Sequence, residues 1–238
     1  MYILGIETTG PFCSVALINE KEVLNTKKSE DRMNHLSSLT PMINQVLKEE
    51  ALSLNEIDAI AVSKGPGSFT GIRIGVSTAR ALGQIVGVKL IGVPTLQAFG
   101  YSLDEYEGIV CPILDARRNQ VYGAAYKEYE KIVKDGPYML DEFLGLLEET
   151  MILMPRDTEV TFIGDGVAAY RDELTRWSKA AGKKVRVMEN TYQDAKAVAL
   201  LGRDLLDRGI YTDYNNLKPE YMRKAEAERR LEERLKNG

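Results

Sequence analysis

A stretch of eleven residues with three glycines, Ser63–Arg73, constrains the fold of this chain more than any other. It follows an apolar run at 57–62 and precedes a helical pattern of small residues at 74–86. Glycine lets the backbone turn where a Cβ would clash, and Pro66 fixes φ and has no N–H to donate. Ser68 or Thr70 is a candidate N-cap for the helix that follows. The stretch therefore predicts a strand, a tight loop and a helix N-terminus whose free N–H groups can hold an anion.

The role of this loop stays open on spacing alone. The glycines at 65, 67 and 71 match neither the phosphate-binding loop of the Walker type nor the dinucleotide-binding pattern. A glycine-rich turn that only joins a strand to a closely packed helix needs no ligand. An anion site and a purely structural turn are both compatible with these residues.

Size, charge and cysteine usage limit the class of protein. A chain of 238 residues suits one large domain or two small lobes. A net charge of −4 argues against a protein that mainly coats nucleic acid, although a local patch could still contact one. Cys13 and Cys111 are expected to be reduced core residues. No apolar run reaches the ~18 residues of a membrane helix and no signal peptide is visible, so we expect a soluble, cytoplasmic protein.

The first half of the chain predicts an N-terminal lobe, 1–103. Short apolar runs separated by Gly-Pro and Asn-Glu turns predict strands, and apolar residues at three- and four-residue spacing predict helices. The expected strands are 2–6, 14–18, 23–27, 54–62 and 89–93, and the expected helices are 34–49, 70–87 and 94–103. A polar joint at 104–108 is the expected boundary between lobes.

The second half, 104–238, repeats this plan. The expected strands are 109–114, 120–126, 131–134, 160–163 and 185–188, and the expected helices are 140–150, 166–181 and 195–207. The repeat predicts a duplicated ribonuclease-H-like unit with a mixed sheet in each lobe. A charged tail follows Pro219, with a helix expected at 225–236. We favour a solvated tail over one that contacts a partner or a nucleic acid, and leave open that the terminal helix returns to the first lobe.

The helix at 70–87 has apolar or small residues on nearly every face. Such a helix is usually buried on more than one side. One side is expected on the sheet, and the other on a neighbouring helix or on another protein. Arg73 and Arg80 are the only charged residues between Phe69 and Val88, and we place them at the rim of that contact. An ordinary central helix of a large fold is the alternative.

Candidate catalytic groups are few. His35 is the only histidine, so a multi-histidine metal site cannot be assembled, and a capping or packing role is expected. Glu7 follows the first strand, where it either positions a metal or water or caps the adjoining turn. Glu7, Asp115 and Asp165 could converge between the lobes, as in an ATP-dependent phosphotransferase of the acetate- and sugar-kinase type. Against that function, no segment is typical of adenine binding.

Two adjacent arginines, Arg117 and Arg118, follow Asp115 at the end of an expected strand. One of them could face a cleft and bind a phosphate or a carboxylate. The alternative is an Asp–Arg pair that fastens the lobes, and we favour that alternative.

Four stretches resemble the bacterial TsaB family, also called YeaZ, whose members take part in tRNA processing and modification. The most specific is Gly-Pro-Gly-Ser-Phe-Thr-Gly-Ile-Arg-Ile-Gly at 65–75. The others are Ile-Leu-Gly-Ile-Glu-Thr-Thr at 3–9, Asp-Ala-Arg-Arg-Asn-Gln-Val-Tyr at 115–122 and Lys-Pro-Glu-Tyr-Met-Arg at 218–223. The motif at 3–9 by itself is weak, because many actin-like and sugar-kinase-like proteins begin similarly. The chain departs from the family after His35, which leaves the role of that residue open.

The resemblance implies a two-lobed actin-like ATPase (ASKHA) fold and a non-catalytic subunit with no activity of its own. Such a subunit binds and activates TsaD, which transfers threonylcarbamoyl from threonylcarbamoyl-AMP to the adenosine 3′ of the anticodon, giving N6-threonylcarbamoyladenosine. TsaE joins the complex, a homodimer forms through the same protein–protein surface, and tRNA is reached only through the complex. No cofactor of its own is implied, and ATP or ADP is allowed at the complex interface.

The resemblance also places the interface on the helices 34–49 and 70–87. The expected interface residues are Leu36, Leu39, Ile43, Val46, Arg73, Ile74, Ser77, Thr78, Arg80, Ala81, Leu82 and Ile85. The candidates for nucleotide or anion contact are Glu7, Gly65, Gly67, Ser68, Thr70, Asp115 and Arg117. We expect no catalytic and no metal-binding residue.

Overall fold

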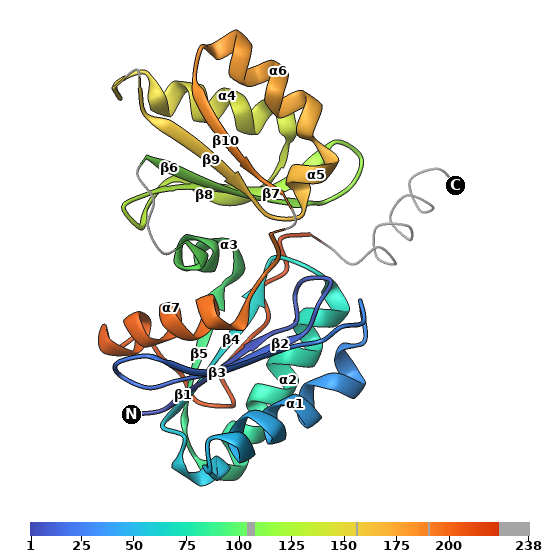
Figure 1. Ribbon diagram of the computed structural model, residues 1–238, viewed down its shortest axis with the longest axis vertical. Helices are drawn as coiled ribbons and strands as arrows, with labels where there is room; N and C mark the ends of the chain where they lie inside the picture. The colour runs from blue at the N-terminus through green and yellow to red at the C-terminus, as the bar shows by residue number, and fades with distance from the viewer. Residues whose placement is uncertain (104–107, 156, 190, 224–238) are drawn as a thin grey trace.

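The computed structural model describes residues 1–103, 108–155, 157–189 and 191–223 (Figure 1). They form two lobes, one above the other, each built on a five-stranded sheet. The helix expected at 225–236 lies outside the described residues, as does most of the joint expected at 104–108. Every helix in the described part of the chain is too short or too polar to cross a membrane.

The first lobe contains a mixed sheet in the order β3-β2-β1-β4-β5. Its strands are β1 (Ile3–Glu7), β2 (Ser14–Ile18), β3 (Val23–Lys28), β4 (Ala59–Gly65) and β5 (Lys89–Pro94). β1 runs antiparallel to β2 and parallel to β4, and β4 runs parallel to β5. This pairing brings the ends of β1 and β4 together, so the turn after Glu7 adjoins the glycine loop.

Helices cover both faces of the first sheet. Leu4 and Ile6 of β1 pack with α1 (His35–Glu49) and α2 (Phe69–Val86). Ile3 points to the opposite face and packs with α7 (Ala195–Asp207). Because both faces are covered, β1 is an uninterrupted buried apolar run and not an alternating one. α7 thus lies on the first lobe although its sequence follows the second (Figure 1).

Glycines let α2 pack tightly against the turn after β1. The Ser68 side chain caps the helix by accepting a hydrogen bond from the Gly71 N–H at 3.2 Å. A Cβ at Gly71 would collide with the carbonyl oxygen of Thr8, and one at Gly75 with the Thr8 hydroxyl. Of the two expected N-caps, Ser68 is confirmed, whereas Thr70 lies inside the helix and is exposed.

The second lobe repeats the topology of the first. Its sheet has the order β10-β9-β6-β7-β8, with β6 antiparallel to β7 and parallel to β9. The strands are β6 (Ile109–Asp115), β7 (Gln120–Lys127), β8 (Glu130–Met139), β9 (Glu159–Ile163) and β10 (Lys184–Met188). The matching order and directions agree with the expected duplication of a mixed sheet.

The two faces of the second sheet pack against different elements. One packs against α4 (Leu140–Met151), α5 (Gly166–Ala169) and α6 (Arg171–Ala181). The other packs against the connection between lobes, which is α3 (Thr95–Ala98) and the short 3₁₀ segment η2 (Phe99–Ser102). Phe99 is fully buried there, so this connection forms part of the core of the second sheet.

Four expected elements differ from the structure. The helix expected at 94–103 is a four-residue α3 followed by the 3₁₀ segment η2. The strand expected at 54–62 begins at Ala59, because Ser53 and Glu56 form a capping box around the 3₁₀ turn η1 (Leu54–Glu56). The strand expected at 131–134 extends to Met139 as β8. The helix expected at 166–181 is broken at Tyr170 into α5 and α6.

Candidate functional site

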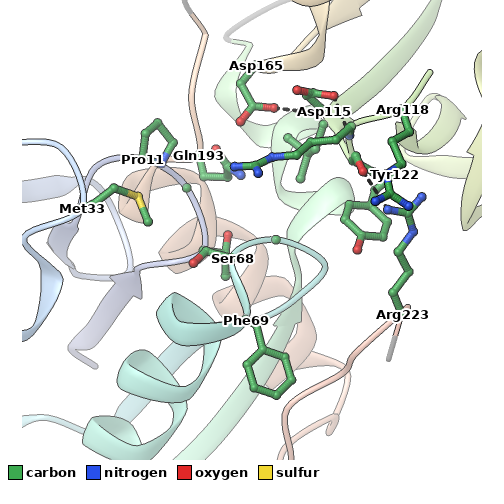
Figure 2. Close-up of a pocket in the computed structure, with 16 residues that line it drawn as sticks. Pro11, Met33, Ser68, Phe69, Asp115, Arg118, Tyr122, Asp165, Gln193 and Arg223 are labelled. Carbon is green, nitrogen blue, oxygen red and sulfur yellow. Dashed lines mark hydrogen bonds between the residues drawn. The ribbon is translucent and has the colours of Figure 1, made fainter. Parts of the chain in front are cut away.

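A cleft of about 670 Å³ lies between the lobes (Figure 2). The first lobe contributes the turn after β1 and the glycine loop before α2. The second lobe contributes the loop between β6 and β7 and the start of α5. The lining residues are Thr9, Gly10, Pro11, Met33, Gly67, Ser68, Phe69, Leu114, Asp115, Ala116, Arg117, Arg118, Tyr122, Asp165, Gln193 and Arg223.

Glu7 lies beneath this cleft and does not line it. Its side chain is 1% exposed. One carboxylate oxygen accepts hydrogen bonds from the N–H and, at 2.7 Å, the hydroxyl of Thr9, and the other accepts one from the Ser63 hydroxyl. Burial raises the pKa of Glu7 above its ordinary value, and these hydrogen bonds oppose the rise. The structure therefore gives Glu7 the turn-capping role, one of its two expected roles.

The glycine loop supplies two of its four expected contacts to the cleft. Gly67 and Ser68 line it, and the Ser68 N–H donates to the Thr9 carbonyl at 2.8 Å. Gly65, which precedes a cis peptide bond to Pro66, is buried against the Glu220 backbone instead. Thr70 faces solvent on α2. Only part of the loop is therefore placed to touch a ligand between the lobes.

Asp115 and Asp165 bring two carboxyl groups to the second lobe's side of the cleft. Asp115 accepts hydrogen bonds from the Arg117 N–H at 2.7 Å and the Tyr170 hydroxyl at 3.0 Å. Asp165 accepts one from the Asp115 N–H at 3.0 Å. Burial, reinforced by the nearby Asp115 carboxylate, raises the pKa of Asp165. Glu7 is not part of this pair, so the three expected acids do not converge.

Arg117 and Arg118 occupy a tight loop and have exposed side chains. Both have left-handed backbones, with φ of 62° and 56°. Within the described residues neither forms an ion pair with a carboxylate, so the structure contradicts the Asp–Arg pair expected to fasten the lobes. Asp115 instead bonds to groups of its own lobe. The arginines are left at the cleft as candidates for anion contact.

Among the lining residues that the sequence did not mark as candidates, two have side-chain polar atoms without a partner. Gln193 is 5% exposed, and its side-chain oxygen has no hydrogen-bond partner among the described atoms. One terminal nitrogen of Arg223, Nη2, likewise has no hydrogen-bond partner among the described atoms. Both lie on the wall of the cleft (Figure 2). Arg223 belongs to the recognised stretch at 218–223, whereas Gln193 follows no motif that could have marked it.

The lone histidine has a structural position. His35 is buried at the start of α1, and its Nε2 lies 2.9 Å from the Gly10 carbonyl oxygen. Within the described residues, no group of three or more histidine, cysteine, aspartate or glutamate side chains is arranged to hold a metal ion. His35 therefore takes the packing role expected of it.

The expected interface residues divide by burial. Leu39, Ile43 and Val46 belong to the core of the first lobe, so they cannot form an interface, which corrects the expectation. Leu36 and Ile85 are 80% and 74% exposed. The remaining α2 residues are exposed or half-buried, namely Arg73, Ile74, Ser77, Thr78, Arg80, Ala81 and Leu82.

Arg73 and Arg80 are engaged within the chain. The Arg73 Nε donates to the Tyr221 hydroxyl at 2.9 Å. The Arg80 Nε donates to the Tyr214 carbonyl oxygen at 2.7 Å. Both partners lie in the segment after α7, and both arginines remain exposed, so their place at the rim of a partner contact stays a prediction.

Curated relatives resemble this chain over nearly its whole length. It is 28% identical over 232 residues to the tRNA threonylcarbamoyladenosine biosynthesis protein TsaB of Bacillus subtilis, covering 96% of each chain. It is 29% identical over 236 residues to the protein of the same name from Escherichia coli, covering 97% of this chain and 98% of the other.

Solved structures establish the fold. YeaZ from Pseudomonas aeruginosa superposes with a TM-score of 0.74 at 22% identity, covering 92% of this chain and 99% of the other. A ROK hexokinase from Thermus thermophilus superposes with a TM-score of 0.53 at 11% identity, covering 87% of this chain and 100% of the other. The predicted two-lobed actin-like fold with mixed sheets is confirmed.

The family comparison agrees with these relatives. The family model described as TsaD, tRNA N6-adenosine threonylcarbamoyltransferase, matches residues 23–231. The four motifs, the near-complete similarity to TsaB relatives and the YeaZ fold single out one branch within that match. The chain belongs to this family and, within it, to the TsaB/YeaZ proteins.

Proposed function

We propose that this chain is a non-catalytic subunit in the biosynthesis of N6-threonylcarbamoyladenosine in tRNA. It binds and activates TsaD, which transfers threonylcarbamoyl from threonylcarbamoyl-AMP to the adenosine 3′ of the anticodon. The names of the B. subtilis and E. coli relatives support the pathway. The transferase named by the matching family model supports the choice of partner.

The exposed side of α2 carries this proposal. Ser77, Ala81 and Ile85 recur every four residues and therefore share one face of the helix. Ser77 and Ala81 are small enough to let another helix approach closely, and the exposed Ile85 offers apolar area to bury. Leu36 on α1 adds a second exposed apolar side chain.

The same α2 face serves for a homodimer in the proposed function. TsaE joins the complex of this chain with TsaD, tRNA is reached only through that complex, and the complex works in the cytoplasm. His35, the only histidine of the sequence, supports an accessory role because it is buried and bonded to Gly10. A protein of this kind has no need of a reactive group in its own cleft.

A second proposal concerns the cleft, where a nucleotide or another anion contacts Gly67, Ser68 and Arg117. Gln193 and Arg223 also line this cleft, and their amide and guanidinium groups favour an occupant with both donor and acceptor groups. ATP or ADP at the interface of the complex has such groups. A phosphotransferase activity is less well supported, because Glu7 is buried and bonded away from Asp115 and Asp165.

An experiment on association tests the main proposal. The chain would be mixed with TsaD of its own organism and analysed by size-exclusion chromatography with light scattering. Ala81→Arg should prevent association because it places a long charged side chain on the α2 face, while circular dichroism should show an unchanged fold. Unchanged affinity of this variant for TsaD would overturn the interface.

A further inference from the structure

The chain after α7 runs back along the first lobe, and at Arg223 it reaches the second. Thr212 exchanges two backbone hydrogen bonds with Leu90 of β5, at 2.8 and 2.9 Å. The Tyr214 carbonyl then accepts the hydrogen bond from Arg80 of α2, and Leu217 is buried in the first core. We call residues 212–223 the strap.

The strap next contacts the glycine loop. The Glu220 N–H donates to the Lys64 carbonyl at 2.7 Å, and the two side chains form an ion pair at 2.9 Å. A Cβ on Gly65 would collide with the Glu220 carbonyl oxygen. The absence of a side chain at Gly65 is therefore required by the strap as well as by the turn.

Tyr221 connects the strap to the first turns of α2. Its ring stacks on Phe69 with centroids 4.5 Å apart and planes at 29°. The Arg73 guanidinium lies 4.1 Å from the Phe69 centroid, and its Nε donates to the Tyr221 hydroxyl. Arg73 lies one turn before Ser77 on the exposed side of α2. The strap thus holds a residue at the edge of the proposed partner surface.

Arg223 completes the crossing to the second lobe. Its Nη1 donates to the Ala116 carbonyl at 2.7 Å, and its guanidinium lies 5.5 Å from the centroid of the Tyr122 ring. Figure 2 shows Arg223 rising from the chain below to the residues on the second lobe's side of the cleft. Two residues of the strap, Tyr221 and Arg223, thereby connect α2 to the opposite wall of the cleft.

We propose that the strap couples the exposed face of α2 to the closure of the two lobes. A partner that takes Arg73 from Tyr221 weakens the stack on Phe69, releases Arg223 from Ala116 and lets the cleft open. The contacts of Tyr221 and Arg223 are single hydrogen bonds and ring contacts at partly exposed positions, each of which contributes little net stability. The partner side of this inference rests on the proposed function, whereas the hold on the lobes does not.

The first test measures the distance between lobes in the chain alone. Spin labels are attached at Lys48→Cys on α1 and Lys179→Cys on α6, both exposed. The native thiols are poor targets because both are buried, and burial raises the pKa of Cys13 to about 12. Pulsed electron paramagnetic resonance then gives the distance distribution between the labels.

Arg223→Ala and Tyr221→Ala should each broaden the distribution and move it to longer distances. Tyr221→Phe keeps the stack on Phe69 but loses the hydrogen bond to Arg73, so its shift should be smaller. Arg186→Ala, an exposed arginine on β10, is the matched control and should match the wild type. Circular dichroism separates loss of fold from loss of the strap. Folded Arg223→Ala and Tyr221→Ala variants with the wild-type distribution would overturn the proposal.

The second test measures coupling. Because binding on α2 must displace the strap, Arg223→Ala should raise the affinity for TsaD about fivefold, the low end of typical coupling between two sites. An unchanged affinity beside a changed distance distribution would overturn the coupling. If the wild-type chain bound neither TsaD nor a second copy, the proposed function and the coupling would fail together. The distance measurement would still decide whether the strap holds the lobes.

Discussion

The two lobes share one topology but use the end of their first strand differently. Glu7 ends β1 and is sealed beneath the turn by Thr9 and Ser63. Asp115 ends β6 at the corresponding position and remains exposed at the cleft. One acid is part of the support for the glycine loop, while the other lines the cleft, where a ligand can reach it. Strand position therefore predicts where an acid lies, and its neighbours decide what it does.

The helices α2 and α4 differ in how closely their glycines are packed. α2 presses Gly71 and Gly75 against Thr8, whereas Gly145 in α4 has open space where a Cβ would lie. Close packing thus constrains α2 at Gly71 and Gly75, whereas α4, which does not correspond to α2 in the repeated topology, is permissive at Gly145. The following predictions test these contrasts.

The largest expected effect is on stability. Gly71→Ala should destabilise the protein by about 3 kcal/mol, because the added Cβ overpacks the contact with the Thr8 carbonyl. Gly145→Ala should instead stabilise it by about 0.5–1 kcal/mol, the helix preference of alanine over glycine. Chemical denaturation of both variants measures the difference. Equal effects of the two substitutions would remove the contrast between the helices.

The next effect is on association. Ile85→Arg should weaken binding to TsaD by about 2 kcal/mol, as expected for an apolar contact near the centre of an interface. Ile152→Arg is the matched control, since Ile152 is 75% exposed on the second lobe and Ile85 is 74% exposed on the first. Isothermal titration calorimetry measures both. Equal weakening by the control would place the partner elsewhere.

A smaller effect concerns pH. The folded pKa of Glu7 is raised, so the folded state keeps a proton that the unfolded state releases as the pH rises above about 4.5. The Glu7 carboxyl therefore lowers the free energy of unfolding as the pH rises from its unfolded to its folded pKa. Gln at this position accepts from Thr9 and can donate to the Ser63 hydroxyl without ionising.

Glu7→Gln should accordingly gain stability relative to the wild type as the pH rises, by about 1.4 kcal/mol for each pH unit between the two pKa values. Thermal unfolding from pH 4 to 8 measures this gain. A difference between variant and wild type that stays constant with pH would contradict the buried, proton-retaining carboxyl.

The smallest effect is expected at the cleft. Arg117→Ala should weaken binding of ATP or ADP by about 1 kcal/mol, because an exposed charge contributes little. Arg171→Ala is the control, since Arg171 is exposed on α6 and pairs with Glu189 at 2.9 Å. Fluorescence competition with a labelled nucleotide measures both. Equal affinity of wild type and Arg117→Ala would exclude Arg117 from the contact.

Local patterns predicted most elements of the fold. The ends of β2 and α7 were predicted at the observed residues, because turn residues and apolar spacing define them within a few positions. The break at Tyr170 was missed, since no glycine or proline marks it. The return of α7 to the first sheet depends on contacts between residues far apart in the sequence, which a local pattern does not encode.

The candidate site was predicted less completely for the same reason. Gly67, Ser68, Asp115 and Arg117 line the cleft as expected, because they lie at or just after the ends of β4 and β6. Spacing placed Leu39, Ile43 and Val46 on a helix but did not tell which side faces the sheet. The roles of Arg73 and Arg80 could not be foreseen, because their partners lie more than a hundred residues later.

The most direct test of the proposed role is light scattering after size-exclusion chromatography, on the chain alone and mixed with TsaD of its own organism. We expect the lone chain to elute as a dimer and the mixture to form a complex containing both proteins. Ile85→Arg should reduce the amount of complex and Ile152→Arg should preserve it. A chain that stays monomeric both alone and with TsaD would contradict the proposed role as a partner-binding subunit.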